Sequence, residues 1–292
     1  MTLRRLPDWL KKPLPQGQNV HAIAKEMRSK GLVTVCTEAR CPNLGECWSQ
    51  KTATIMILGD TCTRGCKFCN VKTGNPQQYI NESEIEEASD FAAKAELRYI
   101  VITSVDRDDL PDHGATHFAN VIKAIHNKNA EIKVEVLVPD FGAIEENMKI
   151  LAGASPFVIA HNLETIRRLT PQVRDPRSTY EKSLNVLSYY KKNFPKTATK
   201  SSLMLGLGES TDEILETMDD LLSIGVNILT LGQYLQPSSK QLEVQKFYHP
   251  DEFIELKKIA LQKGFEFVAS GPHVRSSYKA ADYFHYLLSK ES

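Results

Sequence analysis

Three cysteines, Cys62, Cys66 and Cys69, lie within eight positions of one another in the stretch DTCTRGCKFCN. A structural zinc ion is usually held by four protein ligands in paired knuckles, whereas the spacing CxxxCxxC has no fourth Cys or His close behind it. A cubane iron-sulfur cluster has four irons, and a protein can supply thiolates to three of them. The fourth iron is then open to a small-molecule ligand. The spacing therefore favours a [4Fe-4S] cluster over zinc.

A second group of cysteines lies earlier in the chain, at Cys36, Cys41 and Cys47. Its spacing, CxxxxCxxxxxC, matches neither zinc knuckles nor the first group, and three thiolates again leave a cubane one ligand short. Buried structural cysteines are the alternative, because free Cys is among the most buried residue types. The surrounding segment is polar, however, and shows no strand or helix periodicity. With all six cysteines between residues 36 and 69, the pattern indicates metal or redox chemistry rather than a disulfide scaffold.

Short apolar or β-branched runs alternate with amphipathic segments from residue 51 to residue 270. We predict strands at residues 53–59, 98–104, 132–138, 157–162, 201–208, 227–233 and 265–270, and helices at residues 83–96, 114–127, 178–193, 211–225 and 250–264. The last two helices close on a glycine, a common helix stop. This alternation predicts an α/β fold with a parallel sheet, built as a partial (β/α)6-type TIM barrel.

Extensions flank the predicted barrel on both sides. The N-terminal extension, residues 1–50, carries the second cysteine group and a predicted helix at residues 21–31. The C-terminal segment, residues 271–292, contains the motif RSSY and a predicted helix at residues 276–290. The chain is thus divided into residues 1–50, 51–270 and 271–292.

Polar residues follow the predicted strands at their C-terminal ends, where functional groups gather in β/α barrels. The segment CTRGCKFC follows the first strand, and Thr103 and Ser104 close the second. Asn162 and Glu164 follow the fourth strand, and GLGEST, which includes Gly206, follows the fifth. These segments are expected to face one mouth of the barrel. An ordinary turn or helix cap is the alternative for Ser104 and Asn162, as is a bare turn for Gly206.

Three carboxylates follow the second predicted strand, at Asp106, Asp108 and Asp109. They could be taken for a divalent-metal site. Because Arg107 lies among them, we predict a solvated or salt-bridged turn instead.

The charge and hydropathy of the chain exclude several classes of protein. Its 292 residues hold 36 Lys and Arg and 36 Asp and Glu, so the sequence lacks the basic footprint of a nucleic-acid binder. No apolar run reaches the roughly 18 to 20 residues that a membrane helix needs, and residues 1–16 contain no apolar core of a secretory signal. We therefore predict a cytoplasmic protein with neither a nucleic-acid nor a membrane partner.

The CxxxCxxC spacing, with the aromatic Phe68 directly before the last cysteine, resembles the signature of the radical S-adenosylmethionine (SAM) superfamily. The resemblance implies a partial barrel of the radical SAM kind. It also implies that SAM chelates the open iron and that reduction of the cluster cleaves SAM to a 5′-deoxyadenosyl radical. The SAM contacts expected from this resemblance are Phe68, Thr103, Ser104, Asn162, Glu164, Arg174 and Gly206.

Five motifs together resemble those of lipoyl synthases, in order and approximate spacing, over nearly the entire chain. They read ARCPNLGECW, ATIMILGDTCTRGCKFCNVKTGNP, TSVDRDDLPD, HNLET and VRSSY. The resemblance implies two [4Fe-4S] clusters: a SAM-binding cluster on Cys62, Cys66 and Cys69, and an auxiliary cluster on Cys36, Cys41, Cys47 and Ser277. A hard alkoxide matches iron-sulfur chemistry less well than a thiolate, which would make Ser277 a displaceable ligand. Ser276 is the less favoured ligand and is better suited to a helix cap.

Lipoyl synthases insert sulfur at C6 and C8 of an octanoyl chain held in amide linkage on a carrier lysine. The resemblance implies this activity, with two SAM molecules consumed per lipoyl group and the sulfur supplied by the auxiliary cluster, which is sacrificed. The implied partners are an octanoylated lipoyl carrier domain or H-type carrier protein, an electron donor such as ferredoxin or flavodoxin, and an iron-sulfur carrier that rebuilds the cluster.

Three positions depart from the usual pattern of that family. Asn70 stands where Asp is common, QLEV at residues 241–244 replaces His-Leu-Pro-Val, and His273 stands where an apolar residue is usual. None of them is a presumed cluster ligand. The departures therefore leave the expected cluster chemistry intact.

Two other classes of protein compete with this interpretation. A methylthiotransferase is expected to carry an extra N-terminal domain and a C-terminal RNA-binding domain, for which this chain has no room. An electron-transfer iron-sulfur module is expected to be a short chain without a βα series. Both expectations favour the lipoyl synthase resemblance.

Overall fold

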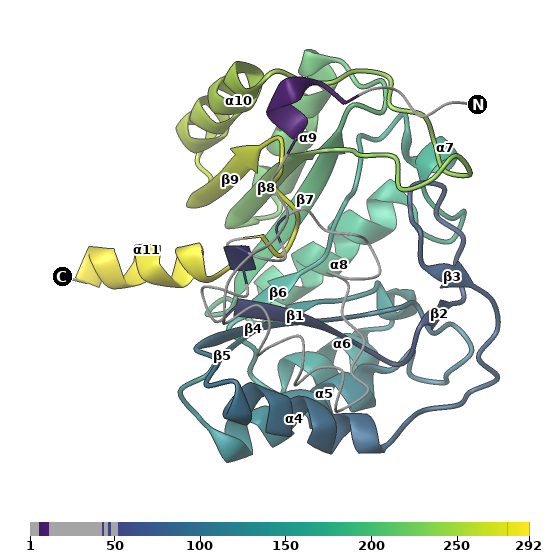
Figure 1. Cartoon of the computed structure of the whole chain (residues 1–292). Coiled ribbons are helices and arrows are strands. Elements are labelled where there is room, and N and C mark those ends of the chain that lie inside the picture. Colours follow the sequence, from purple (N-terminus) through teal and green to yellow (C-terminus); the bar gives the residue numbers. More distant parts are fainter. Residues whose placement is uncertain (1–5, 12–42, 44–45, 48–51, 279, 292) are drawn as a thin grey trace. The chain divides into compact units, whose positions relative to one another are not determined.

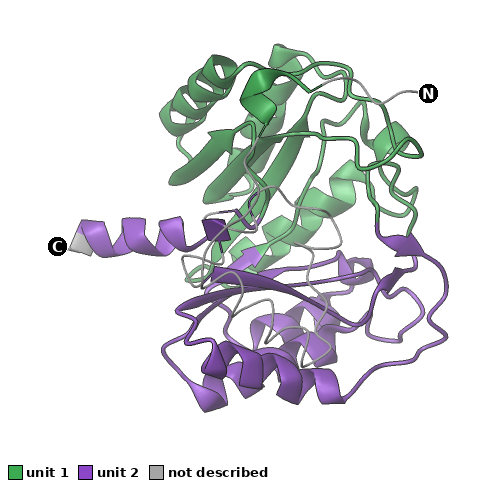
Figure 2. Ribbon diagram, viewed as in Figure 1, with its two compact units in different colours: residues 1–12, 64–70, 160–276 green, residues 13–63, 71–159, 277–292 purple. Residues whose placement is uncertain are grey.

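The computed structural model describes residues 6–11, 43, 46–47, 52–278 and 280–291. The chain divides into two compact units, each assembled from several stretches of sequence (Figure 2). Unit 1 comprises residues 1–12, 64–70 and 160–276, and unit 2 comprises residues 13–63, 71–159 and 277–292. The chain therefore leaves unit 2 after Thr63 and returns to it at Val71. Cys62 thus belongs to unit 2, and Cys66 and Cys69 belong to unit 1. The predicted helix at residues 21–31 lies outside the described residues.

The strands form a seven-stranded sheet in the order β1-β4-β5-β6-β7-β8-β9. Their bounds are Thr52–Ile57 (β1), Tyr99–Ser104 (β4), Lys133–Leu137 (β5), Val158–Ala160 (β6), Ala198–Leu205 (β7), Ile228–Gln233 (β8) and Phe267–Gly271 (β9). The pairs β1–β4, β4–β5, β7–β8 and β8–β9 are parallel. All six residues of β1 are buried, as expected for a parallel strand covered on both faces. The predicted α/β sheet is confirmed, and each predicted strand overlaps one of these.

Helices α4, α5 and α6 belong to unit 2, where Figure 1 shows them along one side of β1, β4 and β5. They span Ser83–Lys94, Ala115–Lys128 and Glu145–Ala152. On α5, Phe118, Val121, Ile122 and Ile125 recur at intervals of three and four residues and are fully buried. This spacing places them on one helix face, which accounts for the amphipathic sequence of the segment. Unit 2 also contains β2 (Thr61–Cys62), β3 (Lys72–Thr73), η2 (Phe141–Ala143) and α11 (Ala281–Glu291).

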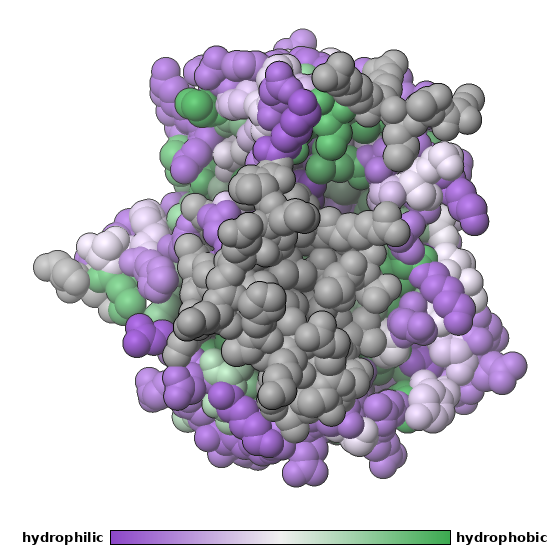
Figure 3. Space-filling view, viewed as in Figure 1, coloured by the Kyte–Doolittle hydropathy of each residue, from purple (hydrophilic) through white to green (hydrophobic). Residues whose placement is uncertain are grey.

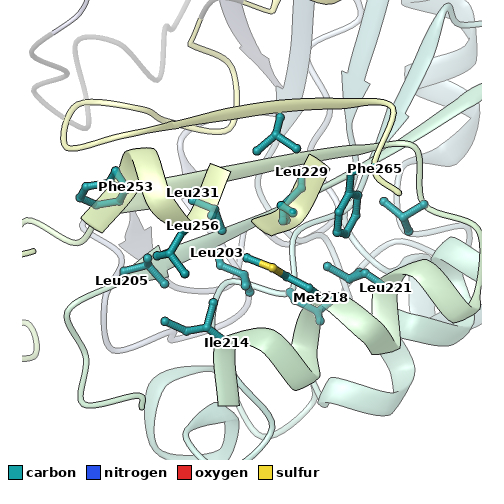
Figure 4. Packing of buried hydrophobic residues seen from close by; sticks show 14 of the residues in the cluster. Leu203, Leu205, Ile214, Met218, Leu221, Leu229, Leu231, Phe253, Leu256 and Phe265 are labelled. Carbon is teal, nitrogen blue, oxygen red and sulfur yellow. The ribbon is translucent and has the colours of Figure 1, made fainter. Parts of the chain in front are cut away.

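The core of unit 1 lies between β7, β8 and β9 and the helices that cover them (Figure 4). These helices are α8 (Tyr180–Asn193), α9 (Thr211–Ser223) and α10 (Pro250–Lys263); the unit also contains η1 (Asp8–Leu10) and the short α7 (Thr170–Val173). Residues labelled in Figure 4, such as Leu203, Leu229, Met218 and Phe253, are almost completely buried. Burying one such side chain contributes about 1.5–3 kcal/mol, so this packing fixes the strand ends of unit 1.

Capping groups set the ends of the helices in unit 1. A capping box between Ser210 and Glu213 begins α9, and a second one between His249 and Glu252 begins α10. Beyond α9 and α10, Gly225 and Gly264 adopt φ values of 81° and 120°, and the glycine stops predicted from the sequence are confirmed.

The sequence-based helices differ from the structure in three places. Helix α6 has eight residues and α7 has four, and neither is long enough to show the periodicity on which the predictions relied. Helix α11 begins at Ala281 rather than at residue 276, so Ser276 lies too far from its first turn to cap it. The RSSY motif is therefore a turn segment that precedes the helix.

Where Figure 3 shows described residues, the hydrophobic side chains on this face lie in separate patches. The large hydrophobic side chains that are exposed, among them Tyr79, Ile254 and Leu288, come from different elements. None of the helices in the described part of the chain has the length and apolar content to cross a membrane.

The turn that leaves β1 and leads into the cysteine motif is held by a buried Glu84–His117 contact and by the ion pair of Arg107 with Asp109. Leu58 has a left-handed backbone, with φ 67°, which is unfavourable for a leucine. Its N–H donates to Glu84 Oε2 at 2.7 Å, and the same oxygen lies 2.7 Å from His117 Nε2. Its carbonyl accepts from Arg107 Nη1 at 3.1 Å, and Arg107 also donates twice to Asp109 at 2.8 Å. The predicted salt-bridged turn is confirmed, with Arg107 buried instead of solvated.

We expect Arg107→Met to destabilise the protein by about 3 kcal/mol or more, because Asp109 then remains buried without its charge partner. The midpoint of urea unfolding, followed by circular dichroism, measures this change. Lys94→Met is the matched control, since Lys94 forms an exposed pair with Asp90 in the same unit and should change stability by less than about 1 kcal/mol. Equal effects of the two substitutions would contradict a structural role for Arg107.

Candidate functional site

The first cysteine of the loop, Cys62, ends β2 and is held by residues of unit 2 that follow β4. The backbone N–H of Asp106 donates to Cys62 Sγ at 3.4 Å. Thr63 donates its backbone N–H to the carbonyl oxygen of Asp106 at 3.0 Å and its hydroxyl to Asp108 Oδ2 at 2.6 Å. The carbonyl of Cys62 accepts from the N–H of Gly74 at 2.9 Å. The C-terminal end of β4 therefore fixes the start of the cysteine motif.

The second cysteine, Cys66, is held within unit 1 by the segment between α7 and α8. The backbone N–H of Asp175 donates to Cys66 Sγ at 3.4 Å, and the carboxylate of Asp175 accepts from the N–H of Gly65 at 2.9 Å. Lys67 donates its backbone N–H to the carbonyl oxygen of Val173 at 2.9 Å. Three consecutive residues of the loop are thus bonded to one short segment more than one hundred positions away.

The charge of Asp175 is stabilised by Arg177, whose Nε and Nη2 donate to it at 2.9 and 3.1 Å. This pairing, more than the bond from Gly65, holds the pKa of Asp175 well below its usual range in spite of burial. The stabilisation is fully present above the unfolded pKa, about 3.9, and is lost only as the pH falls through the lower folded value. The Gly65 bond is therefore insensitive to pH near neutrality.

The third cysteine, Cys69, is held by the loop after β8. Gln241 donates its side-chain Nε2 to the carbonyl oxygen of Cys69 at 3.1 Å, and Leu242 donates its N–H to the carbonyl oxygen of Lys67 at 3.1 Å. The side chain of Phe68 packs against the buried cluster of unit 1 that includes Ile166, Leu169, Val173 and Tyr234. Gln241 is the first residue of QLEV, so a position that departs from the lipoyl synthase pattern contacts the cysteine loop directly.

The donor set of this loop suits an iron-sulfur cluster. Cys62, Cys66 and Cys69 are partly exposed and form no disulfide within the described part of the chain. The sulfurs of Cys62 and Cys66 each accept a backbone N–H, which stabilises negative charge on sulfur. Thiolate is the form that binds iron, and hydrogen bonds to sulfur are one of the factors that set a cluster's reduction potential. The residues therefore fit a cluster held by three cysteines.

Two buried polar atoms of unit 1, Asn162 Oδ1 and Arg174 Nε, have no hydrogen-bond partner among the described residues. Other nitrogen atoms of these two side chains donate hydrogen bonds. Asn162 Nδ2 donates to Glu164 Oε1 at 3.0 Å, and Arg174 Nη1 donates to Ser183 Oγ at 2.8 Å and to the carbonyl oxygen of Leu163 at 3.3 Å. A buried polar atom without a partner costs about 1–3 kcal/mol, so each of the two atoms has hydrogen-bonding capacity that a polar ligand or an ordered water can use. A contact of either residue with SAM stays a prediction.

Glu164 is held in a strained conformation between these two residues. Its φ is 69°, and its N–H and carbonyl bond to the backbone of Ser202 and Met204 on β7. Burial raises the pKa of Glu164, while the charge of Arg174 and the bond from Asn162 act in the opposite direction. A non-glycine residue in the left-handed region costs about 1–3 kcal/mol and persists where the surroundings impose it, often at functional sites.

Gly206 has both of its backbone groups committed within unit 1. Its N–H donates to Glu209 at 2.6 Å, and its carbonyl accepts from the N–H of Gln245 at 2.8 Å. A Cβ added at this position would lie 2.3 Å from Gln233 Nε2 and 2.4 Å from the carbonyl oxygen of Lys246. Packing alone therefore requires glycine here, and a contact between Gly206 and SAM stays a prediction.

Gln233, at the end of β8, is the buried side chain that closes this turn. Its Nε2 lies 3.0 Å from the carbonyl oxygens of Leu205, Tyr234 and Lys246, and its Oε1 accepts from the N–H of Tyr248 at 2.9 Å. One amide thus joins the end of β7, the end of β8 and the segment that leads into α10.

Thr103 and Ser104 close β4 in unit 2, as predicted for the second strand. Thr103 is buried, and the hydroxyl of Ser104 donates to the carbonyl oxygen of Val105 at 2.9 Å. That bond belongs to an ordinary strand-end turn, which was the alternative for Ser104 in the sequence. A contact of either residue with SAM stays a prediction.

Only one residue of the second cysteine group, Cys47, is described; Cys36 and Cys41 lie outside the described residues. Its neighbour Glu46 accepts from the hydroxyl of Tyr278 through both carboxylate oxygens, each at 2.9 Å. Burial, followed by this bond to Glu46, raises the pKa of Tyr278 well above its usual value. The hydrogen bond between Tyr278 and Glu46 therefore joins the segment of Cys47 to the RSSY motif, which contains Ser277.

Several residues that fix these cysteines were missed in the sequence. Asp175, Gln241, Glu46 and Tyr278 all act through bonds to residues more than one hundred positions away. Glu46 and Tyr278 lie inside the motifs GECW and RSSY. Gln241 lies in QLEV, where the sequence departs from the usual lipoyl synthase pattern. Asp175 carries no comparable signal.

Comparison with protein families supports the arrangement of the loop and the sheet. Residues 56–221, more than half of the chain, match the radical SAM superfamily. The fold is similar to that of Streptococcus suis SuiB bound to S-adenosylmethionine, with TM-score 0.59 and 12% identity over 82% of this chain; the chain spans only 56% of that protein. It is also similar to methylornithine synthase, with TM-score 0.55 and 10% identity over 89% of this chain and 86% of that one. The fold and the cysteine loop are those of a radical SAM protein.

Closer relatives define the family within this class. Residues 2–41 match the N-terminal domain of lipoyl synthase. The chain is 51% identical to the lipoyl synthase of Marinobacter nauticus over 96% of its own length and 80% of that protein. It is 50% identical to that of Francisella tularensis subsp. novicida over 94% of its length and 84% of that protein. The chain belongs to the lipoyl synthase family, and this membership implies a [4Fe-4S] cluster and SAM as cofactors.

We expect Asp175→Ala to loosen the cysteine loop, because Gly65 and Arg177 both lose their partner. In the cluster-loaded chain, iron should pass to a chelator roughly three- to tenfold faster, as expected for the loss of a hydrogen bond to a charged group. The decay of the cluster's visible absorbance under anaerobic conditions measures the rate. Asp212→Ala, on the exposed first turn of α9, is the control and should leave it unchanged. An unaltered rate for Asp175→Ala would show that the loop is held without this carboxylate.

Proposed function

We propose that this protein inserts two sulfur atoms, at C6 and C8, into an octanoyl chain carried on a lysine of a carrier domain, and so forms the lipoyl group. As a member of the lipoyl synthase family it is a radical SAM sulfurtransferase. The observation that carries the proposal is the loop in which Cys62 and Cys66 each accept a backbone N–H. Family membership over nearly the whole chain supports the substrate.

Cys62, Cys66 and Cys69 would hold the SAM-binding cluster. When bound, the cluster and SAM together supply the radical that removes hydrogen from the unreactive octanoyl carbon atoms. Asn162, whose Oδ1 has no partner among the described residues, and Glu164, an acceptor, suit the hydroxyl groups of a ribose.

The predicted contact between Arg174 and SAM remains part of this proposal. Its free Nε is a charged donor suited to the carboxylate of SAM. Arg174 lies directly before Asp175 in the chain, so one segment serves both the cysteine loop and the cofactor. The packing of Phe68 against unit 1 supports a role for this side chain in shaping the same site.

We further propose that the sulfur comes from a second, auxiliary [4Fe-4S] cluster, held by Cys36, Cys41, Cys47 and Ser277 and consumed as a substrate. The bond between Tyr278 and Glu46 supports this assignment, because each residue is the chain neighbour of one proposed ligand. Ser277 would leave an iron more easily than a thiolate would, which suits a cluster that must be dismantled.

The three segments of the chain then have distinct roles. Residues 1–50 would carry the three auxiliary cysteines, residues 51–270 the radical SAM barrel, and residues 271–292 the auxiliary serine. The proposed partners are an octanoylated lipoyl carrier domain or H-type carrier protein, a reductant such as ferredoxin or flavodoxin, and an iron-sulfur carrier that rebuilds the auxiliary cluster.

The decisive experiment is anaerobic reconstitution followed by incubation with SAM, a reductant and an octanoyl-lysine peptide. Mass spectrometry should detect mono- and dithiolated peptide together with 5′-deoxyadenosine. Deoxyadenosine without sulfur in the peptide would reject the proposed substrate and retain the radical SAM chemistry. A fully loaded protein that releases no deoxyadenosine would reject both.

We expect Asn162→Ala to weaken SAM binding about tenfold, because the ligand loses a buried hydrogen-bond partner worth about 1–3 kcal/mol. Equilibrium dialysis of the cluster-loaded chain with labelled SAM measures the dissociation constant. Asn193→Ala, at the exposed end of α8, serves as the control. Unchanged affinity in Asn162→Ala would remove this residue from the SAM site.

We expect Ser277→Ala to cleave SAM at close to the normal rate and to lose sulfur insertion. The reason is that the SAM cluster is untouched while the auxiliary cluster lacks its fourth ligand. Deoxyadenosine and thiolated peptide are quantified in the same reaction. Ser276→Ala is the matched neighbour and should retain product formation. Normal product yield from Ser277→Ala would instead contradict its proposed role.

A further inference from the structure

A single hydrogen-bonded contact in unit 2 joins two segments that are 232 residues apart in the sequence. The hydroxyl of Tyr278 donates to Glu46, and both carboxylate oxygens lie 2.9 Å from it. Each of these residues is the immediate neighbour of a proposed ligand, Ser277 or Cys47, and consecutive Cα atoms are about 3.8 Å apart. The bond uses neither ligand atom, so it can persist whether or not iron is bound.

The Glu46 side of this contact has local order of its own. The backbone N–H of Cys47 donates to the carbonyl oxygen of Asn43 at 3.0 Å. Asn43 is 1% exposed, so the acceptor of this bond is buried. The residue that directly follows Glu46 is therefore itself hydrogen-bonded within unit 2.

The other side of Tyr278 is anchored to the sheet of unit 2. Ala280, directly before α11, and Phe284 of α11 pack with Tyr99 and Val101 of β4. The ring of Phe284 meets that of Phe157 edge to face at 5.7 Å. The segment that contains Ser277 is therefore held after the motif by α11 and within the motif by Glu46. Two independent contacts fix it.

We propose that Tyr278 is a positioning residue that keeps Ser277 at the auxiliary cluster site through its bond to Glu46, independently of the metal. This inference rests on the proposed auxiliary cluster. If that cluster is consumed as the sulfur source, the irons and sulfides that connect the four ligands are lost in each turnover. The Tyr278–Glu46 bond then keeps the serine and cysteine segments together, so that a new cluster can be assembled without a new search for the fourth ligand.

The test uses the full chain with Cys62, Cys66 and Cys69 all replaced by alanine, so that any remaining cluster is the auxiliary one. Reconstituted under anaerobic conditions, this parent should hold about four irons. In Tyr278→Phe and Glu46→Ala made in this background, iron should pass to a chelator about five- to tenfold faster. The double variant should be no faster than either single variant, because both remove the same bond. Tyr79→Phe is the control, since its side chain is 71% exposed and its hydroxyl forms no hydrogen bond within the described part of the chain.

A second measurement separates positioning from a general loss of structure. With all six cysteines present, Tyr278→Phe should form 5′-deoxyadenosine at the normal rate, yet rebuild its auxiliary cluster more slowly after turnover when iron and sulfide are supplied. A lower rate of deoxyadenosine formation would indicate a wider defect and overturn the assignment.

The outcomes also distinguish this inference from the proposed function. A parent that holds iron, with equal release rates in Tyr278→Phe and the parent, overturns the role of Tyr278 and leaves the auxiliary cluster in place. A parent that holds no iron rejects the auxiliary cluster and the role of Tyr278 together, while the radical SAM assignment stands. Additive effects in the double variant would show that Glu46 and Tyr278 do not act through their common bond.

Discussion

Hydrogen bonds from distant backbone determine the shape of the cysteine loop. Apart from the two residues of β2, the segment from Cys62 to Cys69 has no strand or helix of its own. Its sulfurs and carbonyls are held by the exit of β4 in unit 2, and by the α7–α8 segment and the loop after β8 in unit 1. Asp106 and Asp175 follow closely after β4 and α7, whereas Gln241 lies in the loop eight residues beyond β8. A substitution that shifts one of these strand ends therefore acts on the thiolates, even if it lies far from them.

Two buried features of unit 1 carry a free-energy cost that the surrounding fold sustains. Asn162 Oδ1 and Arg174 Nε have no partner among the described residues, and Glu164 is held with a positive φ. Their surroundings impose these conformations through bonds to β7 and α8, so the fold maintains the site before any ligand binds. Such preorganisation lowers the entropy lost on binding, because the side chains are already ordered.

The sequence allowed the architecture to be predicted because it depends on local patterns. Apolar runs such as IVITS and amphipathic helices such as residues 211–225 carry their periodicity in consecutive positions. The three cysteines of the loop are likewise a local spacing. Asp175, Gln241 and Tyr278 could not be predicted in the same way, because each acts through a partner brought near by the fold. An aspartate before a proline looks like any turn residue until Gly65 is found 2.9 Å from its carboxylate.

The side chain at position 233 must carry an amide group, because this group both donates and accepts hydrogen bonds. Its amide nitrogen faces three carbonyl oxygens at 3.0 Å, whereas its oxygen accepts an N–H. Deamidation to glutamate would replace that donor by a carboxylate oxygen and set negative charge against three carbonyl dipoles in a buried position. A glutamate at position 233 would therefore disfavour the contact between the ends of β7 and β8 that closes the turn around Gly206. The turn thus depends on the difference between an amide and a carboxylate, two side chains of nearly the same shape.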